Sequence, residues 1–405
     1  MEVALVIGLV WPEPNSSAAG YRMLKLLQIL KEQGYRIVFA SSAQKSQFSA
    51  SLTEWVDEEA EIKLNDNSFD QWVKDLNPNL VLYDRFLTEE QFGWRLRENC
   101  PEAINVLDTE DLHFLRRARH ESVKKTGSCD EVNIKTRDAI REVSSILRCD
   151  LTIMISEYEI KLLQEEFMIP PSMLIYLPFL HNGAYDEVIS FSERKDFVFI
   201  GNFLHEPNKD AVLYLRSIWP KIRKRLPHAK LHIYGAYPMQ QILEIHDEKL
   251  GFFVHGRAEN AKEVISNARV LIAPIRFGAG LKGKLFEAMK FGTPSLTTNI
   301  GAEAMVLEDG TWGGLIANTS EEIIEKCVVL YSDEKVWEDA QYKAKVVLKN
   351  RFYDEQFSQL VIATIENIKL NLAKHRRENF WIEISNFQMN NSTKYLSKWR
   401  EAKNN

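Results

Sequence analysis

The sequence predicts an α/β protein made of two doubly wound domains in tandem. Short, continuously apolar runs alternate with stretches of helical periodicity through most of its 405 residues. Apolar runs of this kind suit strands of a parallel sheet that is covered by helices on both faces. The alternation breaks in the turn-rich segment Phe179–Asp196 and then restarts. We therefore expect one domain before this segment and one after it.

The first domain is expected to span residues 1–183. Met23, Leu27 and Leu30 share one face of a predicted helix that stops at Gly34. The N-terminal run MEVALVIGLVWP is short and carries an acidic residue at its start, so we interpret it as a strand rather than a signal peptide. The predicted strands are VALVIGLV, Arg36–Ala40, Asn79–Asp84, Ala103–Asp108, Leu151–Ser156 and Met173–Pro178.

The second domain is expected to span residues 184–369, and residues 370–405 form a C-terminal helical extension rich in basic and aromatic residues. We expect this extension to pack on the protein and to fray at its end. Helical patterns cover Pro207–Leu226, a stretch near Ala261–Ala268 and the segment Ser320–Lys369. The predicted strands are DFVFIGNF, KLHIYGAYP, GFFVHG, RVLIAPIRF, TPSLTTN and GGLIAN.

Composition and charge exclude several classes of protein. With 45% hydrophobic and 27% charged residues the chain has enough apolar material for a folded core, and a net charge of −6 argues against a non-specific nucleic-acid partner. No uncharged apolar run approaches the ~20 residues that span a bilayer. The cysteines are widely spaced, which is typical of free thiols in a reducing cytosol and predicts no metal site.

The segment Arg276–Pro294, RFGAGLKGKLFEAMKFGTP, combines a glycine-rich turn with the start of a helix. In an open parallel sheet such a turn lies at the carboxyl end of a strand, where ligands bind, and the free N–H groups of the helix attract phosphate. Lys284 and Glu287 are three residues apart on one stripe of this helix, whereas Leu281, Leu285 and Ala288 should face the core. We interpret the stripe as a nucleotide site, with a surface Lys–Glu pair beside a flexible turn as the alternative.

At these residues the chain resembles the GT-B glycosyltransferases, in particular glycosyltransferase family 4, also called glycosyl transferases group 1. The resemblance extends to about Lys369 and is more specific in the second half. It implies two Rossmann-like domains that face a cleft, a nucleoside-diphosphate sugar as donor (UDP or GDP being favoured), and no cofactor or metal. The residues that carry it are APIRFGAGLKGKLFEAMKFGTPSLTT, FIGNFLHEPNKDAV, LPHAKLHIYG, VHGRAENAKEVISNARVLIAP, WPEPNSSAAGYR and VLDTEDLHFLRRAR.

The resemblance also implies roles for individual residues. Lys284 would hold the donor diphosphate and His113 would contact the donor sugar, so these two are the expected catalytic residues. Arg257 would lie against the base and Glu287 would hold the ribose. The remaining donor-site residues are expected at Gly201, Asn202, Gly278, Ala279, Gly280, Leu281 and Lys282, and the acceptor side at Gly20, Arg22, Asp108 and Glu110.

The chain departs from the family pattern at two places. Ala279 stands where many members carry a first glutamate seven residues before the second, which is Glu287 here, so the donor sugar cannot be inferred. Asn202 replaces a positive residue, whose role Lys209 or Arg276 would take. The implied reaction retains configuration and uses His113 to position the sugar. Asp108 or Glu110 would orient this histidine, or act as base if the reaction inverts.

Two features favour a contact with lipid, and each has an alternative. The basic run His113–Lys125 and the C-terminal extension suit anionic lipid or a lipid-linked acceptor at the cytoplasmic face of a membrane, as an enzyme of polysaccharide biosynthesis would need. A solvated helix face is the alternative for the basic run. For the C-terminal extension, packing on the protein is the expected role, and a membrane-surface or partner contact is the alternative. Rival functions on the same fold are a non-catalytic nucleotide-sugar-binding protein and a nucleotide-sugar epimerase. A dehydrogenase is disfavoured because GLVWPEPNSSAAG lacks the dinucleotide fingerprint.

Overall fold

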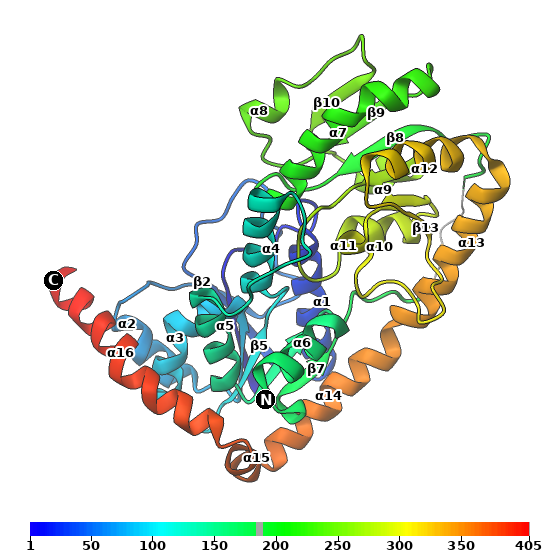
Figure 1. The fold of residues 1–405 in the computed structure, drawn as a ribbon. Helices are drawn as coiled ribbons and strands as arrows, with labels where there is room; N and C mark the ends of the chain where they lie inside the picture. The colour runs from blue at the N-terminus through cyan, green and yellow to red at the C-terminus, as the bar shows by residue number, and fades with distance from the viewer. Residues whose placement is uncertain (184–188, 405) are drawn as a thin grey trace.

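The protein folds into two parallel sheets, each covered by helices, as its computed structural model shows for residues 1–183 and 189–404 (Figure 1). Both sheets are continuous parallel ladders, so the expected pair of doubly wound domains is confirmed. The predicted boundary between residues 183 and 184 adjoins residues 184–188, which lie outside the described residues.

The N-terminal domain is built on a sheet of strand order β3-β2-β1-β4-β5-β6-β7. Its strands are β1 Val3–Gly8, β2 Arg36–Ser41, β3 Glu58–Glu61, β4 Leu80–Asp84, β5 Ile104–Asp108, β6 Leu151–Met154 and β7 Leu174–Tyr176. Its helices are α1 Ala18–Glu32, α2 Ser68–Leu76, α3 Arg85–Asn99, α4 His113–Thr126, α5 Arg137–Arg148 and α6 Glu157–Phe167. The predicted strands form, but β3 was missed because its sequence, EEAE, is a polar edge strand without apolar alternation.

The C-terminal domain has the strand order β10-β9-β8-β11-β12-β13. Its strands are β8 Lys195–Ile200, β9 Leu231–Tyr234, β10 Phe252–Gly256, β11 Ala268–Ala273, β12 Ser295–Thr297 and β13 Gly314–Ile316. Its helices are α7 Glu206–Arg225, α8 Gln240–Leu243, α9 Ala261–Asn267, α10 Gly283–Lys290, α11 Asn299–Ala302, α12 Ser320–Ser332 and α13 Glu334–Arg351. Leu281, Leu285 and Ala288 are buried in the core, as the periodicity of the Arg276–Pro294 segment predicted.

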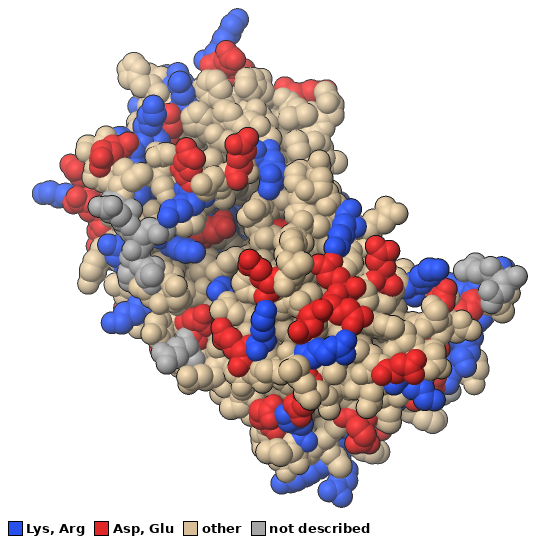
Figure 2. All heavy atoms as spheres, turned by 180° about the vertical axis from the view of Figure 1, so that it is seen from behind, with Lys and Arg blue, Asp and Glu red and all other residues tan. Residues whose placement is uncertain are grey.

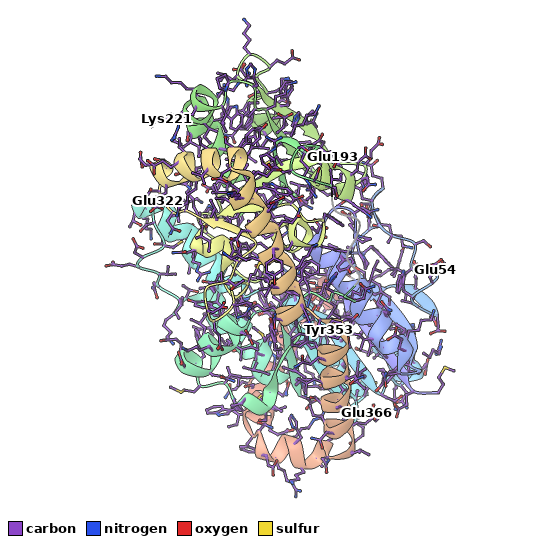
Figure 3. The ribbon with its side chains drawn as sticks, turned by 90° about the vertical axis from the view of Figure 1, so that its right-hand side faces the viewer. Glu54, Glu193, Lys221, Glu322, Tyr353 and Glu366 are labelled. Atoms are coloured by element: carbon purple, nitrogen blue, oxygen red, sulfur yellow. The ribbon has the colours of Figure 1, made fainter. Side chains whose placement is uncertain are left out.

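The chain then returns to the N-terminal domain, which corrects the expected limit at residue 369. Helix α14 (Asp354–Leu370) continues past α13 along the side of the molecule, where Tyr353 and Glu366 mark its course in Figure 3. Val361, Ile365 and Ile368 of α14 lie in the core of the N-terminal domain. A short helix, α15 (Leu372–Glu378), leads into a long one, α16 (Trp381–Asn404), so the extension is helical to Asn404 where a frayed end was expected.

The two domains are joined at two chain crossings that lie side by side. His181, on the outgoing segment, forms a parallel β-bridge with Tyr353, on the returning one. The His181 amide donates to the Phe352 carbonyl oxygen (2.6 Å), and the Asp354 amide donates to the His181 carbonyl oxygen (2.9 Å). This paired strip therefore holds the two chain connections between the domains together.

The strand order places the functional edge of each sheet. Because every strand pair is parallel, the carboxyl ends of all strands in one sheet meet at one edge, and the edges of the two sheets face each other across a cavity. Seen from behind, acidic and basic side chains are interspersed, and acidic ones gather near the middle of the face (Figure 2). This face therefore offers no continuous basic surface of the kind that binds nucleic acid.

Candidate active site

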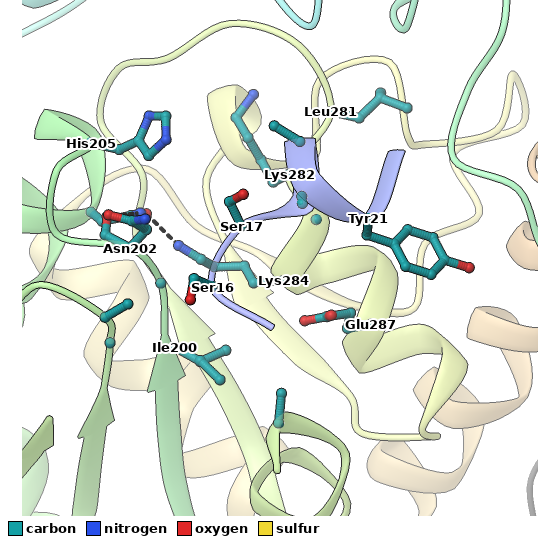
Figure 4. A pocket seen from close by; sticks show the side chains of 18 of the residues that line it. Ser16, Ser17, Tyr21, Ile200, Asn202, His205, Leu281, Lys282, Lys284 and Glu287 are labelled. Atoms are coloured by element: carbon teal, nitrogen blue, oxygen red, sulfur yellow. Dashed lines mark hydrogen bonds between the residues drawn. The ribbon is translucent and has the colours of Figure 1, made fainter. Parts of the chain in front are cut away.

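The cavity between the domains has a volume of about 640 Å³ and takes its walls from the carboxyl ends of both sheets. The loop after β1 and the ends of β4 and β5 form the wall on the N-terminal side. The ends of β8, β9 and β10 and the turn from β11 into α10 form the other wall (Figure 4). A cavity of this size accommodates a nucleotide-sized ligand.

Lys284 lies at the start of α10, with its ammonium group at the cavity (Figure 4). It donates to Oδ1 of Asn208 on α7 and lies 4.4 Å from the centre of the Phe199 ring. Gly201 makes room for this arrangement, because a Cβ there would come within 2.7 Å of Nζ. Burial lowers the pKa of Lys284 to about 7, against the opposing effect of Glu287. A dianionic ligand would restore the full positive charge.

Glu287 and Lys282 flank Lys284 at the same wall. Glu287 lies one turn further along α10, and burial raises the pKa of its carboxyl group. The Lys282 ammonium donates to the carbonyl oxygens of Ala279 (3.2 Å) and Gly280 (2.6 Å), and burial lowers its pKa to about 8. This wall therefore carries two lysines that can bind an anionic ligand. It also carries one carboxyl group, Glu287, which lies deeper.

The glycine-rich turn meets the cavity only in part. Gly278, Ala279 and Leu281 line it, but Gly280 does not. The Gly280 amide donates to Oε1 of Glu159 on α6 (2.7 Å). In this arrangement it therefore cannot donate to a diphosphate, although we expected Gly280 at the donor site. Gly280 has φ of 60° and a Cβ there would lie 2.8 Å from the Cβ of Asp111, so glycine is required where the two domains touch.

His113 is the first residue of α4 and is buried at the cavity wall. Burial lowers its pKa to about 3, so its ring is neutral at physiological pH. Its Nε2 lies 3.5 Å from Oδ1 of Asp111. The expectation that Asp108 or Glu110 orients His113 was therefore wrong, because Asp111 is the carboxylate beside the ring.

Three of the four residues expected on the acceptor side lie behind the cavity wall. Arg22 and Asp108 form a buried ion pair (2.9 Å), and Arg22 also donates to the Leu177 carbonyl oxygen (2.6 Å). Neither lines the cavity. Gly20 does not line it itself, but its neighbours Ala19 and Tyr21 do, so the loop that contains Gly20 meets the cavity as expected. The Arg22–Asp108 pair instead fixes α1 against β5.

Glu110 does line the cavity, together with Arg85, which the sequence did not point out. Both have positive φ, 62° and 67°, at the ends of adjacent strands, a strained backbone conformation that is common at functional sites. Oε1 of Glu110 is buried without a hydrogen-bond partner. Burial, with Asp108 nearby, raises the Glu110 pKa to about 8, so the carboxyl group is largely protonated at neutral pH and can donate a hydrogen bond.

The other expected donor residues, Gly201, Asn202 and Arg257, line the opposite wall. The Arg257 guanidinium lies over the Phe48 ring at 4.5 Å, which joins the two domains. Arg276 forms an ion pair with Asp210 (2.5 Å) and, like Lys209, does not line the cavity, so neither takes the place of the positive residue missing at Asn202.

Buried carboxylates from distant parts of the chain were missed in the sequence analysis. Glu142 accepts from the amides of His113 (3.1 Å) and Phe114 (2.8 Å), and Glu159 accepts from Leu112 (3.2 Å) as well as Gly280. Burial raises their pKa values to about 8 and about 7, respectively. Both lie on helices whose sequences give no sign of this contact.

The chain is similar to known glycosyl transferases in part of its sequence and in its fold. Residues 194–333 match the family model described as Glycosyl transferases group 1. The fold matches the pneumococcal O-GlcNAc transferase GtfA, solved with UDP and GlcNAc, at a TM-score of 0.64 and 14% identity, over 91% of this chain and 99% of GtfA. The protein has the GT-B fold, and the match to the glycosyl transferases group 1 model lies in its C-terminal domain. The resemblance inferred from the Arg276–Pro294 segment is thus confirmed.

Two further similarities cover shorter parts of the relatives. A variant of S. aureus TarM, solved with UDP, fondaparinux and α-GlcNAc-glycerol, has the same GT-B fold at a TM-score of 0.58 and 13% identity. That match covers 74% of this chain and 58% of TarM. An uncharacterized 44.6 kDa protein in the cps region of Klebsiella pneumoniae is 24% identical over 165 residues, which are 39% of this chain and 42% of the relative.

In the described ranges, no group of three or more histidine, cysteine or acidic side chains is arranged to hold a metal ion. The described helices include none that is both long and apolar enough to cross a bilayer.

Proposed function

We propose that this GT-B protein is a glycosyltransferase that moves a sugar from a nucleoside-diphosphate sugar to a hydroxyl of a glycan or lipid-linked acceptor. The observation that carries the proposal is the pair Lys284 and Glu287, one turn apart on α10 and both at the cavity between the domains. UDP is the favoured donor nucleotide because TarM and GtfA were solved with it. The Klebsiella relative in a cps region supports a place in polysaccharide biosynthesis.

The chemistry follows from the charges at the donor wall. The bond between the sugar carbon and the diphosphate oxygen breaks, and negative charge grows on the leaving diphosphate. Lys284, Lys282 and the N-terminus of α10 would stabilise that charge. The acceptor oxygen forms the new bond on the same face of the sugar, and its proton passes to the leaving phosphate oxygen. Configuration is then retained.

The N-terminal wall would position the sugar. A neutral His113, held beside Asp111, can hydrogen-bond to a sugar hydroxyl but is a poor base, because its pKa is about 3. The protonated Glu110 carboxyl group would donate a second hydrogen bond from the same side. We therefore assign both residues to orientation of the donor sugar rather than to proton abstraction.

A nucleotide-binding experiment tests the donor site. Isothermal titration with UDP, GDP, ADP and TDP should give one preferred nucleotide. Lys284→Ala should weaken it at least about tenfold, because a charge-assisted hydrogen bond to phosphate contributes roughly 1.5–3 kcal/mol. Lys290→Ala is the matched control, since Lys290 ends the same helix without lining the cavity. Absence of binding for all nucleotides would contradict the proposal.

One observation favours a second candidate, a non-catalytic nucleotide-sugar-binding protein. Ala279 lines the cavity at the position where a carboxylate would hold sugar hydroxyls. Release of nucleoside diphosphate from the preferred donor sugar, with and without a panel of glycan acceptors, separates the two. Tight donor binding with no release under any condition would favour the binding protein.

A further inference from the structure

Helix α16 lies across the outside of the N-terminal domain, against α3 and α5 (Figure 1). Its inner face carries Ile382, Asn386 and Ser397, which are all buried. Arg95 of α3 forms an ion pair with Glu401, and Lys394 forms one with Glu98. The helix is therefore fixed to the domain by its inner face, and its outer face is free to contact something else.

The outer face of α16 is aromatic. Trp381, Ile384, Tyr395 and Trp399 are 54%, 40%, 63% and 55% exposed. They are separated by intervals of roughly one, three and one helical turns, so they form one stripe along the helix. The stripe is flanked by Phe380, Phe387 and Leu396, which are 61%, 68% and 48% exposed. Exposed apolar stripes of this kind mark interaction surfaces.

The same face carries positive charge. Lys398 and Lys403 are exposed beside the stripe, and the Lys403 ammonium lies 4.0 Å from the centre of the Trp399 ring. Glu401 points inward to Arg95, so among the described side chains it does not pair with Lys398 or Lys403. The aromatic stripe together with these two lysines is called the α16 outer face below.

We propose that the α16 outer face docks on the surface of a bilayer that contains anionic lipid. Tryptophan and tyrosine favour the boundary between water and lipid, and lysine and arginine favour anionic headgroups. Lipid fits better than a second copy of the chain, because aromatic and basic side chains together match the boundary between headgroups and acyl chains.

The basic run at His113–Lys125 does not supply such a surface. In α4, Arg116 pairs with Asp111, Arg117 with Asp138 and Arg119 with Glu303. These arginines form ion pairs within the protein. Most of the positive charge of this run is therefore already paired and is not available for the lipid contact that we considered. The α16 outer face keeps its charge.

Vesicle binding by the full chain tests the proposal. Co-sedimentation with vesicles of phosphatidylcholine and phosphatidylglycerol is compared with phosphatidylcholine alone, at low and high salt. The wild type should bind the anionic vesicles and be released by salt. The triple variant Trp381→Ser, Tyr395→Ser, Trp399→Ser and the double variant Lys398→Glu, Lys403→Glu should each lose at least about tenfold in partitioning. The substituted side chains are exposed, so the fold should persist.

The control variant changes matched exposed residues elsewhere, Tyr342→Ser with Lys349→Glu on α13, and should bind vesicles like the wild type. Lack of wild-type binding, or equal binding by all variants, would overturn the proposal. A lipid-free dimer that the triple variant abolishes would assign the face to a second copy instead. Nucleotide affinity should be unchanged in every variant. A negative result for lipid binding can therefore be told apart from a negative result for the proposed sugar transfer.

Discussion

At the scale of residues, the main feature of the site is a set of buried ionisable side chains. Burial lowers the pKa of Lys284 to about 7 and raises that of Glu110 to about 8. At neutral pH, Lys284 is thus only partly charged and Glu110 largely neutral. Binding of an anionic donor would therefore take up a proton, which makes donor affinity depend on pH.

We expect the affinity for the preferred nucleoside diphosphate to fall as pH rises above about 7, approaching tenfold per pH unit while one proton is taken up on binding. Lys284→Arg should bind with a flatter profile, because a guanidinium stays charged throughout. Titration calorimetry between pH 6.5 and 9 in buffers of different ionisation enthalpy measures both affinity and proton uptake. The nucleotide's own ionisation is common to both proteins, so identical profiles would contradict the assignment of Lys284.

Only some residues of the site were predictable from the sequence. Lys284, Glu287 and Arg257 follow a strand in a recognisable pattern, and the parallel topology brings such positions together. Asn208 and Glu159 contact the same turn from other helices, where ordinary polar residues give no signal of burial. Arg22 and Asp108 were misplaced because their mutual pairing depends on how α1 packs against β5.

At the scale of elements, the start of α4 is organised by two buried carboxylates. Glu142 of α5 and Glu159 of α6 accept the first amides of the helix and its preceding residue, which no intrahelical partner would satisfy. Glu159 also accepts the Gly280 amide, so α4 and the glycine-rich turn are held by one side chain. The cap therefore links the two walls of the cavity.

Glu142→Gln should change stability in a pH-dependent way. The folded-state pKa of Glu142, about 8, is above its ordinary value, so the wild type binds an extra proton on folding and loses stability relative to the variant as pH rises from about 4.5 to 8. We expect the free energy of unfolding of the wild type, relative to that of the variant, to fall by roughly 3 kcal/mol across this window. Urea unfolding of both proteins at pH 5 and pH 8 measures it; a constant difference would contradict the buried, protonated state.

The glycine-rich turn offers a separate prediction. Gly280→Ala should destabilise the closed arrangement of the domains, because it adds a positive-φ penalty of about 1 kcal/mol and a methyl group against Asp111. Gly127→Ala is the matched control, with φ of 80° and open space around its Cβ position. We expect Gly280→Ala to weaken nucleotide binding several-fold more than Gly127→Ala does. Equal effects would mean that the contact with Asp111 is unimportant.

At the scale of the whole molecule, the two domains are held together around the cavity. Arg119 of α4 donates to Glu303 (2.7 Å) and to the Gly278 carbonyl oxygen (2.8 Å), while Tyr237 donates to Glu13 (2.9 Å) from the other side. With the paired crossings at His181 and Tyr353 as the connection, these contacts define a closed state that an open state would break.

Arg119→Met should shift the protein towards the open state. Small-angle scattering should show a larger radius of gyration without ligand, and nucleotide affinity should fall by about threefold to tenfold, because part of the binding energy is spent on closure. Arg117→Met is the control, since Arg117 pairs with Asp138 inside the N-terminal domain. A compact Arg119→Met protein with wild-type affinity would contradict the role of this contact.

The fold class could be predicted because alternating apolar runs and amphipathic helices specify parallel sheets almost regardless of detail. The domain against which the last helices pack could not be predicted. The periodicity of residues 354–404 indicates which face of a helix is buried, but not which domain covers it. Val361, Ile365 and Ile382 pack on the N-terminal domain, although the chain just before them belongs to the C-terminal domain.

This return of the chain has a consequence for biosynthesis. The core of the N-terminal domain needs Val361, Ile365, Ile368 and Ile382, which leave the ribosome after the whole C-terminal domain has been made. The C-terminal domain, begun later, can complete its core first. We therefore expect the nascent N-terminal domain to expose part of its apolar surface for most of translation and to rely on chaperones until the final helices arrive.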